Sequence, residues 1–212
     1  MQYVRSRSCA IDLFRNYHLQ FTMLSGSLGH FLDKPLSSFA RRVNLHPNVF
    51  TIAGFLITAV AAVTIPMDLI LAGILIIVGG VFDMLDGIIA RVNNRTTKFG
   101  AFLDSVLDRY SDAFLFLGFA WYFHKSASMT GVFLSLGAMV GALMISYTRA
   151  RAEGLGKECH VGLMERPERV ILMAFGALTG WVLQVMWLML VLTHVTVIQR
   201  FFYVWKGLKV SE

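Results

Sequence analysis

Long tracts without a charged side chain constrain this sequence more than any other feature. They cover residues 48–67, 69–82, 113–124, 126–148 and 170–199. Several of them approach the roughly 20 apolar residues that a helix needs to cross the hydrocarbon core of a bilayer. Hydrophobic residues make up 56% of the chain, a larger share than an ordinary soluble domain has. The sequence therefore predicts an all-α, polytopic membrane protein.

The number of helices depends on the last tract. As one straight helix, residues 170–199 would extend about 45 Å and overrun the bilayer. Thr179 and Gly180 offer a turn inside this tract, so we expect two helices there. With a few polar residues added at the ends of the shorter tracts, the sequence predicts six transmembrane helices. Their expected ranges are 48–66, 69–92, 99–124, 127–152, 163–180 and 183–203.

The basic residues predict the orientation of these helices. Of the 19 lysines and arginines, only Lys125 falls in a loop on the side opposite the N-terminus. Loops rich in lysine and arginine stay in the cytoplasm. We therefore expect a multi-pass protein of the plasma membrane, with both termini and its functional site on the cytoplasmic side.

The residues before the first helix fall into two parts. In residues 33–45, apolar side chains recur at helical spacing opposite Arg41 and Arg42. This pattern is typical of an amphipathic helix on an anionic membrane surface, with a solvated linker as the alternative. Residues 1–32 match no regular element and are expected to form a poorly ordered extension. The helical domain is then expected to cover residues 46–203, and a cytoplasmic tail residues 204–212.

Five aspartates lie where the second and third predicted helices meet, although an isolated carboxylate in a bilayer is costly. Asp83 and Asp86 are one helical turn apart, and Asp104 and Asp108 share one face of the next helix. Four carboxylates at similar depth repel one another unless cations are bound. Such oxygen-rich clusters suit Mg²⁺ or Mn²⁺. Asp112, one turn deeper, is expected to be a structural hydrogen-bond partner.

The spacing around these aspartates resembles the signature of the CDP-alcohol phosphotransferase family. Eight positions match in Asp83-x2-Asp86-Gly87-x2-Ala90-Arg91-x8-Gly100-x3-Asp104-x3-Asp108. The resemblance covers about residues 45–203 and implies a six-helix, homodimeric membrane enzyme, in which an alcohol hydroxyl displaces CMP from a CDP-linked lipid. It also implies that Asp83, Asp86 and Asp104 hold two divalent ions, Mg²⁺ or Mn²⁺. By the same resemblance, Asp108 completes the metal site and is the catalytic general base.

Two further segments belong to the expected nucleotide site. The resemblance places the start of the first helix, in PNVFT (residues 47–51), against the nucleotide, and the loop after the second helix against the diphosphate. Arg91 can meet a phosphate with two hydrogen bonds, and Gly87 lets a ligand approach the backbone. Helix capping, close helix packing and an interfacial arginine are the alternatives. The expected CDP-diacylglycerol site comprises Asn48, Val49, Phe50, Thr51, Gly87, Arg91 and Thr97.

Arginines at the cytoplasmic ends of the later helices point to the acceptor. Such charges favour an acceptor alcohol that already carries a phosphate, although pairing with Glu165 and Glu168 is the alternative. The segments SYTRARAEGLG and ERPER resemble the branch of the family that uses inositol 1-phosphate, which has lysine in place of Arg149. By this resemblance, the acceptor-phosphate pocket comprises Ser146, Arg149, Arg151, Arg169 and Arg200.

We therefore predict an enzyme of phospholipid synthesis that transfers the phosphatidyl group of CDP-diacylglycerol to inositol 1-phosphate and releases CMP. Glycerol 3-phosphate is the alternative acceptor. A divalent-cation transporter is the alternative from another class, but transporters place their sites near the midplane, often within paired repeats. Membrane lipids are expected partners, and nucleic acid is not.

Overall fold

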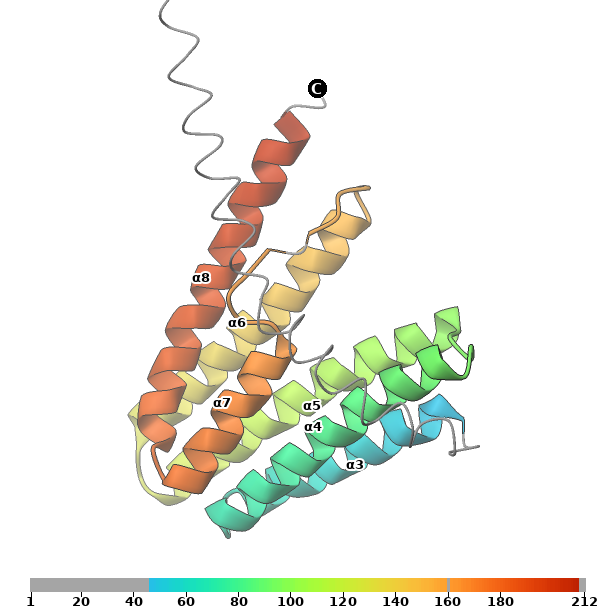
Figure 1. Cartoon of the computed structure of the whole chain (residues 1–212). Coiled ribbons are helices and arrows are strands. Elements are labelled where there is room, and N and C mark those ends of the chain that lie inside the picture. The colour runs from blue at the N-terminus through green and yellow to red at the C-terminus, as the bar shows by residue number, and fades with distance from the viewer. Residues whose placement is uncertain (1–45, 160, 210–212) are drawn as a thin grey trace, which may run out of the picture.

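The computed structural model of this chain describes residues 46–159 and 161–209, and all regular secondary structure in that part is helical (Figure 1). This confirms the predicted all-α class. Two predicted segments lie outside the described residues, namely the surface helix at 33–45 and the extension at 1–32. The six helices are α3 (Pro47–Thr64), α4 (Leu69–Val92), α5 (Lys98–Lys125), α6 (Met129–Glu153), α7 (Arg166–Thr179) and α8 (Val182–Lys209).

Local sequence signals set the helix boundaries. The Asp68 carboxylate accepts two backbone N–H groups in the first turn of α4, and the Thr97 hydroxyl accepts the N–H of Gly100 at 2.9 Å in α5. Helix α7 ends at Gly180, whose φ of 75° is a left-handed conformation that glycine adopts readily. The long tract 170–199 is therefore divided at the predicted turn.

Four helices in the described part of the chain are long and apolar enough to cross a membrane, namely α3, α4, α6 and α8. These four helices support the prediction of a membrane protein. They are two fewer than the six transmembrane helices predicted from the sequence. Helix α5 is long, but it carries Asp104, Asp108, Arg109 and Asp112 between its start and its middle. Helix α7 has 14 residues, which rise only about 21 Å.

Contacts between the helices link all six of them in a closed ring. Helix α3 packs against α4 and α5, α5 against α6, α6 against α8, and α7 joins α4 to α8. Phe116, Phe119, Met186 and Met189 are among the fully buried side chains of the core. Although α4 and α5 are joined by a short loop, each packs more extensively against α3 than against the other. The fold thereby leaves space between α4 and α5.

Candidate active site

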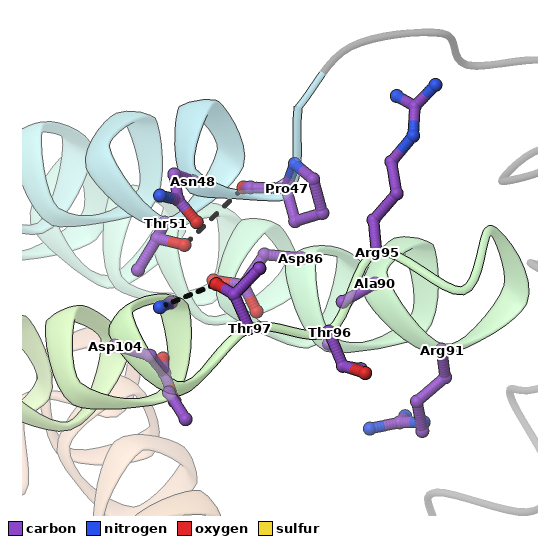
Figure 2. Close-up of a pocket in the computed structure, with 13 residues that line it drawn as sticks. Pro47, Asn48, Thr51, Asp86, Ala90, Arg91, Arg95, Thr96, Thr97 and Asp104 are labelled. Carbon is purple, nitrogen blue, oxygen red and sulfur yellow. Dashed lines mark hydrogen bonds between the residues drawn. The ribbon is translucent and has the colours of Figure 1, made fainter.

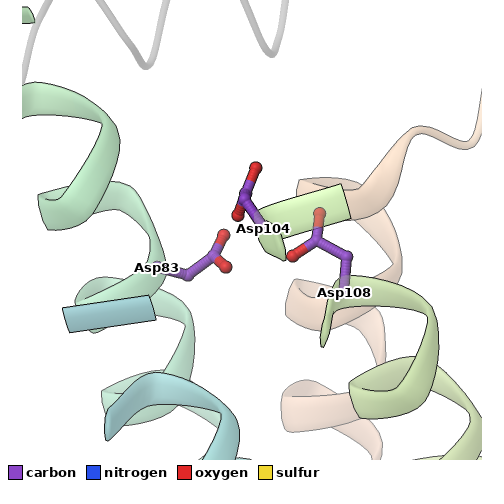
Figure 3. A group of neighbouring side chains, drawn as sticks. All are labelled: Asp83, Asp104 and Asp108. Carbon is purple, nitrogen blue, oxygen red and sulfur yellow. The ribbon is translucent and has the colours of Figure 1, made fainter. Parts of the chain in front are cut away.

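Three aspartates from two helices converge in this space (Figure 3). Asp83 on α4 and Asp104 and Asp108 on α5 each place a carboxylate oxygen within 4.8 Å of the others. Figure 3 shows the three carboxylates facing a common space between the two helices. Carboxylate oxygens are the ligands that Mg²⁺ and Mn²⁺ prefer. The chemistry of these donors therefore fits a divalent cation.

Asp86 lies one turn from Asp83 along α4, at the side of the cluster. Its side chain is buried, and within the described part of the chain its Oδ2 atom has no hydrogen-bond partner. Burying an unpaired carboxylate oxygen is costly unless a cation or a donor reaches it. Asp86 lines a pocket together with Asp104, which also belongs to the cluster of three. Asp86 is thus positioned between the aspartate cluster and the adjoining pocket.

This pocket, with a volume of about 180 Å³, lies where the start of α3, the end of α4 and the start of α5 meet (Figure 2). Five of the seven residues expected at the CDP-diacylglycerol site line it. These five are Asn48, Thr51, Gly87, Arg91 and Thr97. Val49 is half exposed and does not line the pocket, while the Phe50 ring lies 6.1 Å from the Phe82 ring. Only one face of the PNVFT segment therefore faces the pocket.

The pocket residues also support the local helix geometry. The Thr51 hydroxyl donates to the carbonyl of Pro47 at 3.4 Å, and Thr97 is the N-cap of α5. A Cβ at Gly87 would lie 3.2 Å from Nη1 of Arg91, so glycine makes room for this guanidinium to lie back along α4. The capping alternative is thus observed for Thr97, whereas the neighbours of Gly87 belong to Arg91 on the same helix and not to a packed second helix.

Arg95 and Thr96 also line the pocket, although they are not among the residues predicted from the sequence. Figure 2 shows Arg91, near the end of α4, and Arg95, in the loop that follows, extending in different directions. The only signal for Arg95 in the sequence is its position in the basic loop NNRTTK, which does not reveal which way its side chain points.

A larger cavity of about 800 Å³ lies on the other side of the cluster, between α5, α6, α7 and α8. Asp104 lines both cavities, and Asp108 lines the larger one. Four of the five residues expected in the acceptor-phosphate pocket are brought together here. These are Ser146, Arg149, Arg169 and Arg200. Arg151 is exposed and does not line the cavity.

Arg169 has structural partners in addition to its place in this cavity. Its Nη2 atom donates to Asp112 Oδ2 at 2.6 Å, and its Nη1 atom donates to the carbonyl of Met164 at 3.0 Å. Both charged side chains are buried. Asp112 is therefore the structural partner that the sequence analysis expected, and it holds an arginine that had been assigned to the acceptor.

Arg200 is also buried and links three segments of the chain. Its Nε atom donates to the carbonyl of Val161 at 2.7 Å, and Nη1 donates to the carbonyl of Ile145 at 2.6 Å. Helix α8 is thereby tied to the end of α6 and to the loop before α7. Arg149 instead pairs with Glu153 on its own helix at 2.9 Å and remains exposed.

Arg166 contacts the aspartate cluster directly, and the sequence did not predict these contacts. It opens α7, and its Nη1 atom contacts Asp83 Oδ2 and, at 2.8 Å, Asp108 Oδ1. The sequence predicts Arg166 among the arginines at the cytoplasmic helix ends near the aspartates, but it does not predict that this arginine pairs with them. The packing of α7 against α4 brings it there.

Comparison with known proteins gives a consistent result for almost the whole helical part. The model of the family described as CDP-alcohol phosphatidyltransferase matches residues 44–204. The archaetidylinositol phosphate synthase of Methanothermobacter thermautotrophicus is 38% identical over 182 residues, covering 82% of this chain and 90% of that protein. The phosphatidylinositol phosphate synthase of Mycobacteroides abscessus is 37% identical over 179 residues, covering 80% of this chain and 81% of that protein.

Solved structures are similar as well. The phosphatidylinositol phosphate synthase of Mycobacterium tuberculosis with CDP-DAG bound has a TM-score of 0.73 at 34% identity, covering 82% of this chain and 93% of that one. The structure of the same enzyme in complex with manganese and citrate has a TM-score of 0.71 at 34% identity, covering 82% of this chain and 88% of that one.

Proposed function

Because the chain belongs to the CDP-alcohol phosphatidyltransferase family, we propose that it transfers the phosphatidyl group of CDP-diacylglycerol to the hydroxyl of inositol 1-phosphate. CMP is the other product. Membership of this family identifies the chain as a membrane-associated enzyme of phospholipid synthesis and not as a cation transporter.

One observation carries the choice of acceptor: the large arginine-lined cavity opens onto the aspartate cluster. Arg149, Arg166, Arg169 and Arg200 line it, and Asp108 borders it. Guanidinium groups bind phosphate with charge-assisted, often paired hydrogen bonds, whereas a neutral polyol gains little from them. The names of the curated relatives share an inositol phosphate product, which supports inositol 1-phosphate among phosphorylated alcohols.

The aspartates are proposed to hold the divalent ions. Asp83, Asp104 and Asp108 have the mutual distances of a shared site, and Asp86 offers an unpaired oxygen beside them. Two ions, Mg²⁺ or Mn²⁺, are proposed, and a related structure contains manganese. Such ions, when bound, supply positive charge that stabilises the diphosphate and the departing phosphate of CMP.

Asp108 is proposed to be the general base, because it belongs to the cluster and also lines the acceptor cavity. The acceptor oxygen forms a bond to the β-phosphorus of CDP-diacylglycerol, and the bond from that phosphorus to the bridging oxygen of CMP breaks. The proton of the acceptor hydroxyl passes to the carboxylate of Asp108. A base at this position faces the alcohol on one side and the diphosphate on the other.

The smaller pocket is proposed to hold the nucleotide end of CDP-diacylglycerol. Asn48 and Thr51 lie on one wall, and Gly87, Arg91 and Thr97 on the others. The pocket shares Asp104 with the acceptor cavity, so donor and acceptor would meet at the aspartate cluster. The structure of a related enzyme with CDP-DAG bound supports the donor assignment.

The placement in the membrane is also proposed. Helices α5 and α7 complete six spans, because they close the ring with the four apolar helices. Nearly all lysines and arginines lie at the helix ends on one side, and this side is proposed to face the cytoplasm. The active site lies at the same ends, on the cytoplasmic side of the plasma membrane. A homodimer is proposed on the family resemblance, with a catalytic domain at 46–203 followed by a short tail.

The purified protein, CDP-diacylglycerol and a panel of alcohols test this function through the release of CMP. Inositol 1-phosphate should be the best acceptor, glycerol 3-phosphate poor and free inositol inert, with the Asp83→Asn variant as the inactive control. Equal rates with free inositol and its phosphate would refute the acceptor pocket. A preference for glycerol 3-phosphate would retain the pocket and refute the named acceptor.

A further inference from the structure

Arg166 bridges the aspartate cluster with a single nitrogen atom. Nη1 contacts one oxygen of Asp83 on α4 and, at 2.8 Å, one oxygen of Asp108 on α5. All three side chains are largely buried, so solvent screens these charges only partly. Both oxygens belong to residues proposed as ligands of a divalent cation. The arginine therefore contacts the groups that such a cation needs.

The contacts of Arg166 differ from those of the other buried arginines nearby. Arg169 pairs with Asp112, outside the cluster of three aspartates, and donates to a backbone carbonyl. Arg200 donates to two backbone carbonyls. The contacts found for Arg166 within the described residues are both with carboxylates of the cluster. Its guanidinium thus balances the charge of the cluster. Arg169 and Arg200 instead combine backbone carbonyls with carboxylates outside the cluster, namely Asp112 and, at 3.9 Å, Glu165.

Arg166 also lines the arginine-rich cavity that adjoins the cluster. It is the first residue of α7 and is followed by Pro167, so the backbone at this point is held while the long side chain can rotate. A change of rotamer can therefore redirect the guanidinium from the carboxylates to the cavity. The same charge can serve either of two neighbouring sites.

We propose that Arg166 is a tethered cation that competes with the divalent ion for Asp83 and Asp108, and that once displaced it binds the phosphate of the acceptor alcohol. This inference rests on the proposed function, because it takes the cluster as the metal site and the cavity as the acceptor site. The physical reason is that two cations cannot use the same carboxylate oxygens without strong repulsion.

Competition of this kind links the two sites. A phosphate that draws Arg166 into the cavity leaves the carboxylates free and raises the affinity of the cluster for the ion. By reciprocity, the ion raises the affinity of the cavity for the phosphate by the same factor. The enzyme would then bind its acceptor tightly only when the metal site is loaded.

A titration of the purified protein with Mn²⁺, followed by the electron paramagnetic resonance signal of the free ion, tests the competition without lipid or acceptor. The Arg166→Gln variant should bind Mn²⁺ about tenfold more tightly than the wild type, equivalent to about 1.4 kcal/mol. The matched control is Arg149→Gln. Arg149 lines the same cavity but pairs with Glu153, so its loss should change the Mn²⁺ affinity by less than about twofold.

A second measurement tests the link. Inositol 1-phosphate should tighten Mn²⁺ binding by the wild type, and this effect should be much smaller in Arg166→Gln. If that variant does not fold, Arg166→Lys keeps the charge but loses the planar bridge, and it should bind Mn²⁺ more tightly by a smaller factor.

The outcomes separate this inference from the function on which it rests. Unchanged or weaker Mn²⁺ binding in the Arg166 variants, with normal binding by the wild type, would overturn the competition and leave the metal site intact. An equal effect of inositol 1-phosphate on wild type and Arg166→Gln would overturn the link. No Mn²⁺ binding by the wild type would overturn both the metal site and the role of Arg166.

Discussion

Replacing one partner of the ion pair between Arg169 and Asp112 should lower the free energy of unfolding more than replacing both partners together. The side chains of this pair are 3% and 5% exposed, and the two charged atoms lie 2.6 Å apart. Replacing Asp112 by Leu leaves the guanidinium buried without a counter-ion, and Arg169→Met does the same to the carboxylate. Losing one partner of a buried pair costs about 3–5 kcal/mol, whereas replacing both by apolar residues is often nearly neutral.

Thermal unfolding in detergent, followed by tryptophan fluorescence, measures this cost. For a chain of this size, about 3–5 kcal/mol corresponds to a decrease in Tm of roughly 6–20 °C. Each single variant should show it, and the double variant should recover most of the loss. The control is Arg149→Met, which breaks an exposed pair with Glu153 whose side chains are 40% and 48% exposed. That change should cost less than about 1 kcal/mol.

The same variants reveal whether Arg169 also binds the acceptor. If it contacts the phosphate, the double variant should regain stability but keep a KM for inositol 1-phosphate raised by about ten- to a hundredfold, the equivalent of a charged hydrogen bond. Recovery of both stability and KM would restrict Arg169 to a structural role. Single variants with an unchanged Tm would refute the energetic reasoning altogether.

Three further predictions concern the site and the membrane topology. Asp108→Asn should retain affinity for CDP-diacylglycerol but lose CMP release, because a base acts in the transition state; an equal loss of nucleotide affinity would make it chiefly a metal ligand. Removing divalent ions with a chelator should abolish activity, and Mg²⁺ or Mn²⁺ should restore it in the wild type but not in Asp83→Asn. A cysteine at Trp181 should react with an impermeant reagent from outside the cell, and one at Lys209 should not; labelling at Lys209 would contradict the six-span arrangement.

The helices could largely be predicted from the sequence, because apolar tracts and capping residues act locally. The range 69–92 agrees with α4, and Gly180 ends α7 where the turn was expected. The prediction was less accurate where hydropathy carries no information. Helix α8 continues six residues beyond 203 to Lys209, and α7 begins at Arg166 and not at 163, after the N-cap Glu165.

Within the site, the aspartates could be predicted because their spacing of three and four residues places them on one helix face. The arginine partners could not. Arg166 meets Asp83 across 83 positions of sequence, and Arg169 meets Asp112 across 57. These contacts depend on how α7 packs against α4 and α8, which brings its first turn close to α5. An arginine at a helix end looks the same in the sequence whether it binds a ligand or a neighbouring carboxylate.

The short helix α7 has a consequence for the surrounding bilayer. Its 14 residues are about 9 Å shorter than a hydrocarbon core of about 30 Å, and its first turn carries Arg166 and Arg169. A bilayer adapts to such hydrophobic mismatch by thinning locally. In the proposed six-span arrangement, the leaflet on the side of the active site would then be dimpled beside α7, toward the aspartates. A lipid head group could descend into this depression while its acyl chains remain in hydrocarbon. Water and charge would then reach the diphosphate of the proposed donor without extraction of this lipid from the membrane.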